Sequence, residues 1–178
     1  MSASSSKTWG TSLASHAERA PRRAWIFPIS VGALVAAMVV AIGATISVTG
    51  PWYYGLNLPA YAPDGRLFAL GWTLVYGLSA IAGAGAWRAS PAREGDLLIA
   101  ALALTGFLNI GWSYLFFHWQ APRWALFECL FLLPSALAAL VQAARFSRGS
   151  ALLLLPYLAW VSFAAWFTWD VVRLNSGS

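Results

Sequence analysis

The sequence predicts an all-α integral membrane protein, a bundle of five transmembrane helices. Of its 178 residues, 60% are hydrophobic and only 10% are charged, whereas soluble domains carry about 25% charged residues. The mean hydropathy is +0.65. Five apolar segments also approach the roughly 20 residues that a helix needs to cross the hydrocarbon core of a bilayer. A helix satisfies its backbone polar groups internally, which lipid requires.

The elements are expected in a simple order. Residues 1–25 are polar and basic, and we expect a disordered arm there. Residues 26–175 are expected to form the membrane domain, with spans at about 26–49, 66–87, 97–117, 121–144 and 151–172. The first span is too long for the apolar part of a signal peptide and lacks a clear small-residue cleavage site, which argues against cleavage.

The connection at residues 50–65 differs from the other, short connections. It is rich in glycine, proline and aromatic residues, a composition too rigid for a plain linker. We interpret it as a structured lid over one mouth of the bundle. The lid residues are Trp52, Tyr53, Pro59, Tyr61 and Pro63, with Arg66 just beyond.

The basic residues predict the orientation. The net charge is +5 and the pI near 9.9, but the Lys and Arg residues sit singly or in pairs between apolar runs, so a nucleic-acid surface is excluded. Eight of the 11 fall in the arm and in the connections at 88–96 and 145–150, against three on the other side. The positive-inside rule then places the N-terminus in the cytoplasm and the C-terminus outside. A helical bundle favours a bacterial inner membrane.

Metal and disulfide chemistry find little support. Cys129 is the only cysteine, so no disulfide forms within the chain. No His, Cys or carboxylate pair has metal-ligand spacing. We expect no metal site, no required cofactor and no catalytic residue.

Aromatic and polar residues recur at helical spacing on four spans, so each set is expected to share a face. The sets are Phe68, Trp72 and Tyr76; Asn109, Trp112 and Phe116; Trp124, Glu128, Phe131 and Ser135; Tyr157, Trp160, Ala164 and Thr168. One interpretation is an aromatic-walled cavity for a flat apolar ligand. The other is ordinary helix packing, with Asn109 and Thr168 as hydrogen-bonding glue. The 11 tryptophans favour the cavity, because close helix packing prefers small residues.

Two acidic residues in the spans receive different interpretations. Glu128 lies about two turns into its span, where a charge costs roughly 2.5–3.5 kcal/mol on insertion scales. It is a functional candidate, with a protonated or hydrogen-bonded structural role as the alternative. Asp170 lies near a helix end, three residues before Arg173, and is expected to form a local surface pair.

Several motifs in the right order resemble the translocator protein family, also called tryptophan-rich sensory proteins (TspO/MBR). The similarity runs from about Trp52 to Asn175. Its motifs are Trp52-Tyr53, Leu56-Asn57, Pro59 and Pro63; Phe68, Trp72 and Tyr76; Leu108-Asn109, Trp112-Ser113 and Phe116-Phe117; Trp124-Ala125-Leu126 with Glu128; and Pro156-Tyr157-Leu158-Ala159-Trp160, Phe163-Ala164 and Arg173-Leu174-Asn175.

The resemblance implies a five-helix bundle, usually a dimer, with a cavity under the first loop that binds porphyrins, sterols and benzodiazepine-type drugs. Five residues match positions that line the family's pocket: Asn109, Trp112, Trp124, Trp160 and Ala164. Some members are reported to promote light-dependent porphyrin breakdown, and others act as stress regulators or proposed transporters.

The chain departs from the family's pattern at a few positions. Ala60 and Tyr61 replace an aromatic pair, Asp64 a second proline and Arg66 a tryptophan; Thr168 and Val172 replace an Asn and a Trp. The loss of loop indoles weakens the case for porphyrin photochemistry. Arg66 at the cavity mouth is expected to suit a ligand carboxylate such as a porphyrin propionate.

Three functions follow as hypotheses. The first is a membrane receptor or carrier, sensory or transporting, for a tetrapyrrole (porphyrin or haem) and also for sterol-like or benzodiazepine-type ligands. The second is an enzyme that degrades porphyrin with light and oxygen, and the third an ion-coupled transporter built on Glu128. We expect the lipid bilayer and a second copy of the chain as partners. The expected ligand-binding residues are Phe68, Trp72, Tyr76, Asn109, Trp112, Phe116, Trp124, Glu128, Trp160, Ala164 and Thr168.

Overall fold

The computed structural model describes residues 32, 35–36, 38–39, 42–43 and 50–176. The elements in residues 50–176 are all helices: α2 (Pro51–Tyr54), α3 (Gly65–Ala89), α4 (Ala92–Ser113), the π-helical turn η1 (Tyr114–His118), α5 (Pro122–Ala144) and α6 (Arg148–Leu174). Four helices are long and apolar enough to cross a membrane, when α4 and η1 are taken as one helix. The all-helical prediction is confirmed for this part of the chain.

The expected arm at 1–25 and most of the expected first span at 26–49 lie outside the described residues. Within 26–49, residues 32, 35, 36, 38, 39, 42 and 43 are helical. A Cβ added to Gly32 would lie 3.7 Å from the Ala80 Cβ atom. Part of the first span therefore lies against α3.

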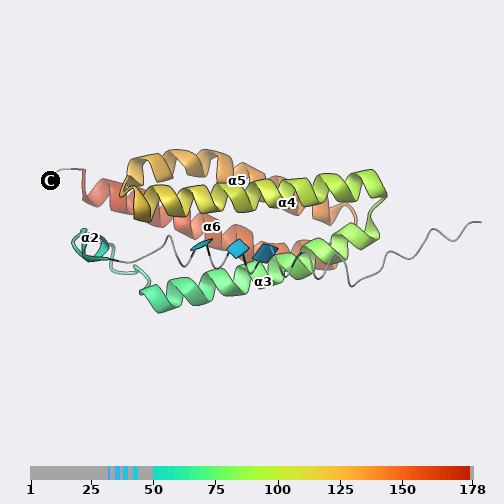
Figure 1. The fold of residues 1–178 in the computed structure, drawn as a ribbon, viewed down its shortest axis with the longest axis horizontal. Coiled ribbons are helices and arrows are strands. Elements are labelled where there is room, and N and C mark those ends of the chain that lie inside the picture. The colour runs from blue at the N-terminus through green and yellow to red at the C-terminus, as the bar shows by residue number, and fades with distance from the viewer. Residues whose placement is uncertain (1–31, 33–34, 37, 40–41, 44–49, 177–178) are drawn as a thin grey trace, which may run out of the picture.

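The four long helices run side by side with alternating direction (Figure 1). Helix α6 packs against α3 and α5, and α4 packs against α5. The starts of α3 and α5 and the ends of α4 and α6 gather at one end, where α2 also lies (Figure 1). We call this the loop end and the opposite end the far end.

The helices extend beyond the predicted spans because hydropathy marks only their apolar part. The predicted 66–87 becomes Gly65–Ala89, and the predicted 151–172 becomes Arg148–Leu174. Polar side chains define the true starts: Asp64 Oδ1 accepts a hydrogen bond from the Leu67 amide at 2.7 Å, and Ser147 Oγ one from the Ser150 amide at 3.2 Å. Such caps satisfy amide groups that the first helical turn leaves without partners.

The buried core changes character along the bundle. At the loop end it contains large rings, among them Tyr53, Phe68, Trp112, Phe116 and Phe167. A separate cluster toward the far end consists of Ala82, Ala86, Leu98, Ala143 and Leu154. We call these the loop-end core and the far-end core. The aromatic residues of the predicted site, with the exception of Trp124, belong to the loop-end core or pack against it.

Candidate functional site

The segment between Gly50 and Gly65 is tied to the end of α6. The Asn57 amide donates to Asn175 Oδ1 at 3.0 Å, and Asn175 Nδ2 donates back to the Asn57 carbonyl at 3.1 Å. The Tyr61 hydroxyl donates to Asp170 Oδ2 at 2.5 Å. Inside the segment, the Tyr53 hydroxyl donates to the Pro63 carbonyl at 3.4 Å. Contacts more than 100 residues apart in sequence therefore hold this segment over the loop end.

Tyr53 and Tyr61 in this segment favour their protonated form. Burial raises the pKa of Tyr53 to about 12, with the nearby Tyr54 as a lesser cause. Burial, and then the hydrogen bond to Asp170, raise the pKa of Tyr61 to about 12. Both hydroxyls therefore remain donors at neutral pH.

Asp170 makes two side-chain contacts, of which the sequence predicts one. Its expected pair with Arg173 is present, with Arg173 Nη2 at 2.8 Å from Asp170 Oδ1. The interpretation as a surface pair is wrong, however, because Asp170 is only 5% exposed and its second oxygen accepts the bond from Tyr61. The carboxylate joins the loop to α6.

Beneath the loop, aromatic rings from α3, α4, η1 and α6 form one continuous network, the loop-end ring cluster. Trp72 stacks on Tyr76 with ring centroids 5.5 Å apart and meets Trp160 edge-on at 5.8 Å. Trp112 stacks on Phe116 at 5.5 Å and on Phe68 at 6.5 Å. The structure thus brings together six of the predicted site residues: Phe68, Trp72, Tyr76, Trp112, Phe116 and Trp160.

The loop reaches this cluster through Trp52, whose ring meets Phe116 edge-on at 5.9 Å. Tyr53 also lies 5.8 Å from Phe117 between ring centroids. Pro63 is buried and Pro59 is half-buried. Of the predicted lid residues, Trp52 and Tyr53 therefore contact the cluster.

Polar groups of the predicted site cross between helices within the cluster. Trp112 Nε1 on α4 donates to Thr168 Oγ1 on α6 at 3.1 Å, and Thr168 Oγ1 donates to the Ala164 carbonyl at 2.7 Å. Asn109 Nδ2 donates to the Tyr76 hydroxyl. Asn109 and Thr168 thus perform the interhelical bonding that the packing interpretation expects.

Other polar atoms of the same residue set have no such partner. Asn109 Oδ1, Trp160 Nε1 and both carboxylate oxygens of Glu128 are buried without a hydrogen-bond partner within the described part of the chain. A buried group left unpaired costs about 1–3 kcal/mol, and most are paired in native proteins. A polar partner for these atoms would therefore stabilise the arrangement.

Gly71 is a site residue that sequence reasoning missed. A Cβ added there would lie 2.3 Å from both Cη2 and Cζ2 of Trp160. The Trp160 ring therefore lies directly on the backbone of α3, a place open only to glycine. A glycine one residue before a tryptophan of the aromatic stripe was the available signal.

Trp124 is not brought to the cluster. It is 65% exposed and lies on the outer face of α5, where it contacts Phe127 at 6.1 Å between ring centroids. Phe131 continues this outer row, 5.6 Å from Phe127, whereas Glu128 faces inward. The set expected to share one face of the fourth span therefore divides between two faces.

A cavity of about 620 Å³ adjoins the ring cluster, and we call it the loop-end cavity. Arg66, Phe68, Trp72 and Tyr76 line it, together with residues of the loop, the first span, α4 and η1. Trp112 and Phe116 are fully buried behind its wall. The arrangement provides ring faces, a cation at the mouth and a volume within the range of small-molecule sites.

The regions matched by known proteins cover most of the chain and include this site. The sequence model of the TspO/MBR family matches residues 24–174. The tryptophan-rich protein TspO of Chlorobaculum tepidum is 33% identical over 153 residues, which cover 80% of this chain and 94% of that protein. Protein CrtK of Rhodobacter capsulatus is 31% identical over 77% of this chain and 86% of its own. The translocator protein of Sus scrofa is 30% identical over 71% of this chain and 76% of its own.

Proposed function

The chain belongs to the TspO/MBR family, and on that premise we propose that it is a membrane receptor or carrier for a tetrapyrrole. The observation that carries the proposal is the loop-end ring cluster, closed by a tied loop and adjoined by a cavity of about 620 Å³. A broad, flat, apolar ligand needs ring faces for stacking and few polar contacts. The cluster supplies both.

The proposed binding mode uses the cavity wall. Trp72, which lines the cavity, offers its ring to the macrocycle, and Trp160 supports Trp72 from behind at 5.8 Å. The unpartnered Trp160 Nε1 and Asn109 Oδ1 supply directional hydrogen bonds after a small shift of the rings. Opening of the loop admits the ligand.

Arg66 gives the proposal its chemical specificity. It lies at the first turn of α3, lines the loop-end cavity and is exposed. A guanidinium binds a carboxylate through two parallel hydrogen bonds. The propionates of a porphyrin are such carboxylates, so Arg66 favours the free acid over its ester.

The test is a titration of the purified protein with protoporphyrin in darkness, followed by tryptophan fluorescence. Trp72→Phe and Trp160→Ala are expected to weaken binding at least about tenfold, a loss of about 1.4 kcal/mol. Trp124→Phe is the matched control, because Trp124 lies on the outer face of α5 and is 65% exposed. Equal affinities for all three variants would overturn the site.

A second titration tests the contribution of Arg66 alone. Protoporphyrin and its dimethyl ester are titrated against the parent protein and Arg66→Gln. The parent is expected to bind the acid several-fold more tightly than the ester, and Arg66→Gln is expected to bind both alike. An unchanged preference in the variant would remove Arg66 from the proposed contact.

Porphyrin breakdown is the second candidate function, favoured by adjacent indoles. Trp72 lies 6.2 Å from Trp112 and 5.8 Å from Trp160 between ring centroids, a spacing that suits electron exchange between rings. Illuminating the bound sample in air is the test. A light-dependent loss of the porphyrin band that Trp72→Phe abolishes would support an enzyme, and a stable band would leave a receptor or carrier.

The remaining features of the proposal concern the assembly and the membrane. We propose five spans, with residues 26–49 as the first, in a homodimer of a bacterial inner membrane. The N-terminus lies in the cytoplasm, as the distribution of Lys and Arg favours. Ion coupling through Glu128 stays a prediction, to be tested by pH-dependent uptake into liposomes with Glu128→Gln.

A further inference from the structure

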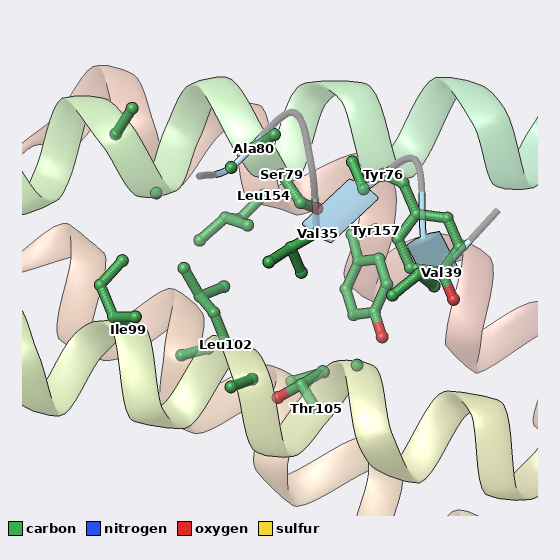
Figure 2. Close-up of a pocket in the computed structure, with 18 of the residues that line it drawn as sticks. Val35, Val39, Tyr76, Ser79, Ala80, Ile99, Leu102, Thr105, Leu154 and Tyr157 are labelled. Atoms are coloured by element: carbon green, nitrogen blue, oxygen red, sulfur yellow. The ribbon is translucent and has the colours of Figure 1, made fainter. Parts of the chain in front are cut away.

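A second cavity, of about 570 Å³, lies between α3 and α4 toward the far end, and we call it the far-end cavity. Figure 2 shows its lining, which is mostly aliphatic or small and comes from α3, α4, α5, α6 and the described part of the first span. It shares Val39, Tyr76 and Ile110 with the loop-end cavity. None of the loop residues lines it.

The far-end cavity is elongated along the bundle. It follows α3 from Tyr76 to Trp87, which at 1.5 Å per residue is about 16 Å. Over this length its wall consists mostly of aliphatic or small side chains. Such a lining suits an aliphatic chain that extends along the bundle.

One polar group stands out on its wall. Tyr157 is 5% exposed, and its hydroxyl has no hydrogen-bond partner in the described part of the chain. Figure 2 shows its ring in the cavity with the hydroxyl directed from α6 toward α4, on the side of Thr105. A phenol at this position has a donor and an acceptor to offer.

The other hydroxyls on the wall are already engaged. Thr105 donates to the Ala101 carbonyl at 2.8 Å, Ser79 to the Val75 carbonyl at 2.7 Å, and the Tyr76 hydroxyl accepts from Asn109. Among the hydroxyls of the described wall, that of Tyr157 is therefore the one without any hydrogen-bond partner, and it lies at the end nearest the middle of the bundle. The opposite end, at Trp87 and Asp96, offers no such buried group.

The cavity also has a route to the lipid. Ile99 and Phe107 of α4 line it and are 41% and 72% exposed. An apolar molecule dissolved in the bilayer can therefore reach it without passing the loop.

We propose that the far-end cavity binds a single aliphatic chain that carries one terminal hydroxyl or carboxylic acid, with that terminal group on the Tyr157 hydroxyl and the chain directed toward Trp87. The ligand and the cavity differ from those of the proposed tetrapyrrole site. The two cavities share Val39, Tyr76 and Ile110 and otherwise have different linings, and we expect that both can be filled at once.

The experiment uses the full chain in lipid nanodiscs with increasing mole fractions of hexadecanol, palmitic acid or hexadecane. Thermal unfolding gives the stabilisation that each probe produces. Hexadecanol is expected to bind about 5–10-fold more tightly than hexadecane, the range for one added hydrogen bond. The palmitic acid arm distinguishes a fatty acid from a fatty alcohol as the source of the terminal group.

Tyr157→Phe isolates the hydrogen bond. Without a probe, the variant is expected to unfold at the same or a higher temperature than the parent, because it loses a buried hydroxyl that lacks a partner. With probes, its preference for hexadecanol over hexadecane is expected to disappear. A lower unfolding temperature without probe, or an undiminished preference, would overturn the proposal.

Two matched variants on α4 test where the ligand binds. Ala103→Phe fills the far-end cavity, which Ala103 lines, whereas Ala100→Phe adds the same ring at an exposed position that does not line it. Only Ala103→Phe is expected to abolish the stabilisation by hexadecanol. Equal behaviour of the two variants, or displacement of hexadecanol by protoporphyrin, would also overturn the proposal. Failure of protoporphyrin to bind would affect only the tetrapyrrole site.

Discussion

The same four helices are packed in two different ways at their two ends. At the loop end the buried core is built from rings, with Trp112, Phe116 and Phe167 fully buried. Toward the far end it is built largely from alanine, with Ala82, Ala86 and Ala143 at 0% exposure. Large flat side chains leave polar edges and adjoining space, whereas small side chains let backbones approach.

This difference in packing is also found at the glycines where neighbouring helices touch. At Gly71, near the loop end, the space for a Cβ is taken by an indole ring. At Gly83 and Gly85, toward the far end, it is taken by Leu102 Cδ1 at 2.9 Å and by Ser150 Oγ at 2.7 Å. The loop end therefore depends on the placement of a few rigid rings, and the far end on many small contacts that can adjust separately.

Gly71→Ala is expected to have the largest effect. The added methyl group lies 2.3 Å from the Trp160 ring, and that ring is itself held by Phe163 at 5.5 Å, so it cannot turn away freely. Overpacking of this kind costs about 1–3 kcal/mol. We expect a lower unfolding temperature in detergent and about tenfold weaker protoporphyrin binding, a change of about 1.4 kcal/mol.

Gly77→Ala is the control on the same helix, because no atom of another described element lies within 4 Å of the added Cβ. Alanine is favoured over glycine in helices by up to about 1 kcal/mol, so this variant is expected to be unchanged or slightly more stable. If Gly71→Ala also behaved in this way, the contact between Trp160 and α3 would be refuted.

Thr168→Val is expected to come next. It removes the acceptor of the Trp112 indole N–H, which lies 3.1 Å away in a fully buried position. Leaving such a donor unpaired costs about 1–2 kcal/mol. Thr168→Ser keeps the hydroxyl and is expected to retain most of the stability in thermal unfolding. A loss of stability in Thr168→Ser with little change in Thr168→Val would show that the methyl group, not the hydrogen bond, matters.

The sequence predicted much of this site but not all of it. Aromatic stripes on α3, α4 and α6 were predicted correctly to come together, because residues spaced by three or four share a helix face. Trp124 and Glu128 have the same spacing, yet one faces outward and the other inward, since four residues on a helix are 40° out of register and the boundary of a face falls between them. Periodicity cannot place that boundary.

Features set by tertiary contacts left no signal in the spacing. Asp170 was predicted to pair at the surface, but its burial depends on Tyr61, which lies 109 residues earlier. The π-helical turn at Tyr114–His118 and the short helix α2 do not change the hydropathy pattern. That pattern therefore could not predict them. Most helix ends were predicted within a few residues, and at the starts of α3 and α6 a polar cap rather than the apolar run marks the end.

Gly85→Ala tests the far end and is expected to have a smaller effect. The added Cβ meets Ser150 Oγ at 2.7 Å, but the gain in helix propensity offsets part of the cost, for a net loss of about 1 kcal/mol or less. Protoporphyrin affinity is expected to stay unchanged. Adding Ser150→Ala removes the clashing oxygen and is expected to restore stability, a coupling that a double-mutant cycle measures. A loss of porphyrin affinity in Gly85→Ala would show that the two ends do not pack independently.

Tyr61→Phe is expected to have the smallest effect on stability, because Tyr61 is 44% exposed and exposed polar contacts contribute little. The hydroxyl is protonated below its ordinary pKa of 10 and is lost as an Asp170 partner only as the pH rises toward about 12. Because folding raises this pKa, its contribution is complete below pH 10 and declines between these two values. Cleavage of the loop by chymotrypsin is therefore expected to be constant from neutral pH to about 10 in the parent protein and several-fold faster in Tyr61→Phe at every pH in that range. Tyr54→Phe, which changes an exposed ring of the same segment, is the control and is expected to match the parent. Faster cleavage in both variants would mean that the loop is held by its aromatic packing rather than by the bond to Asp170.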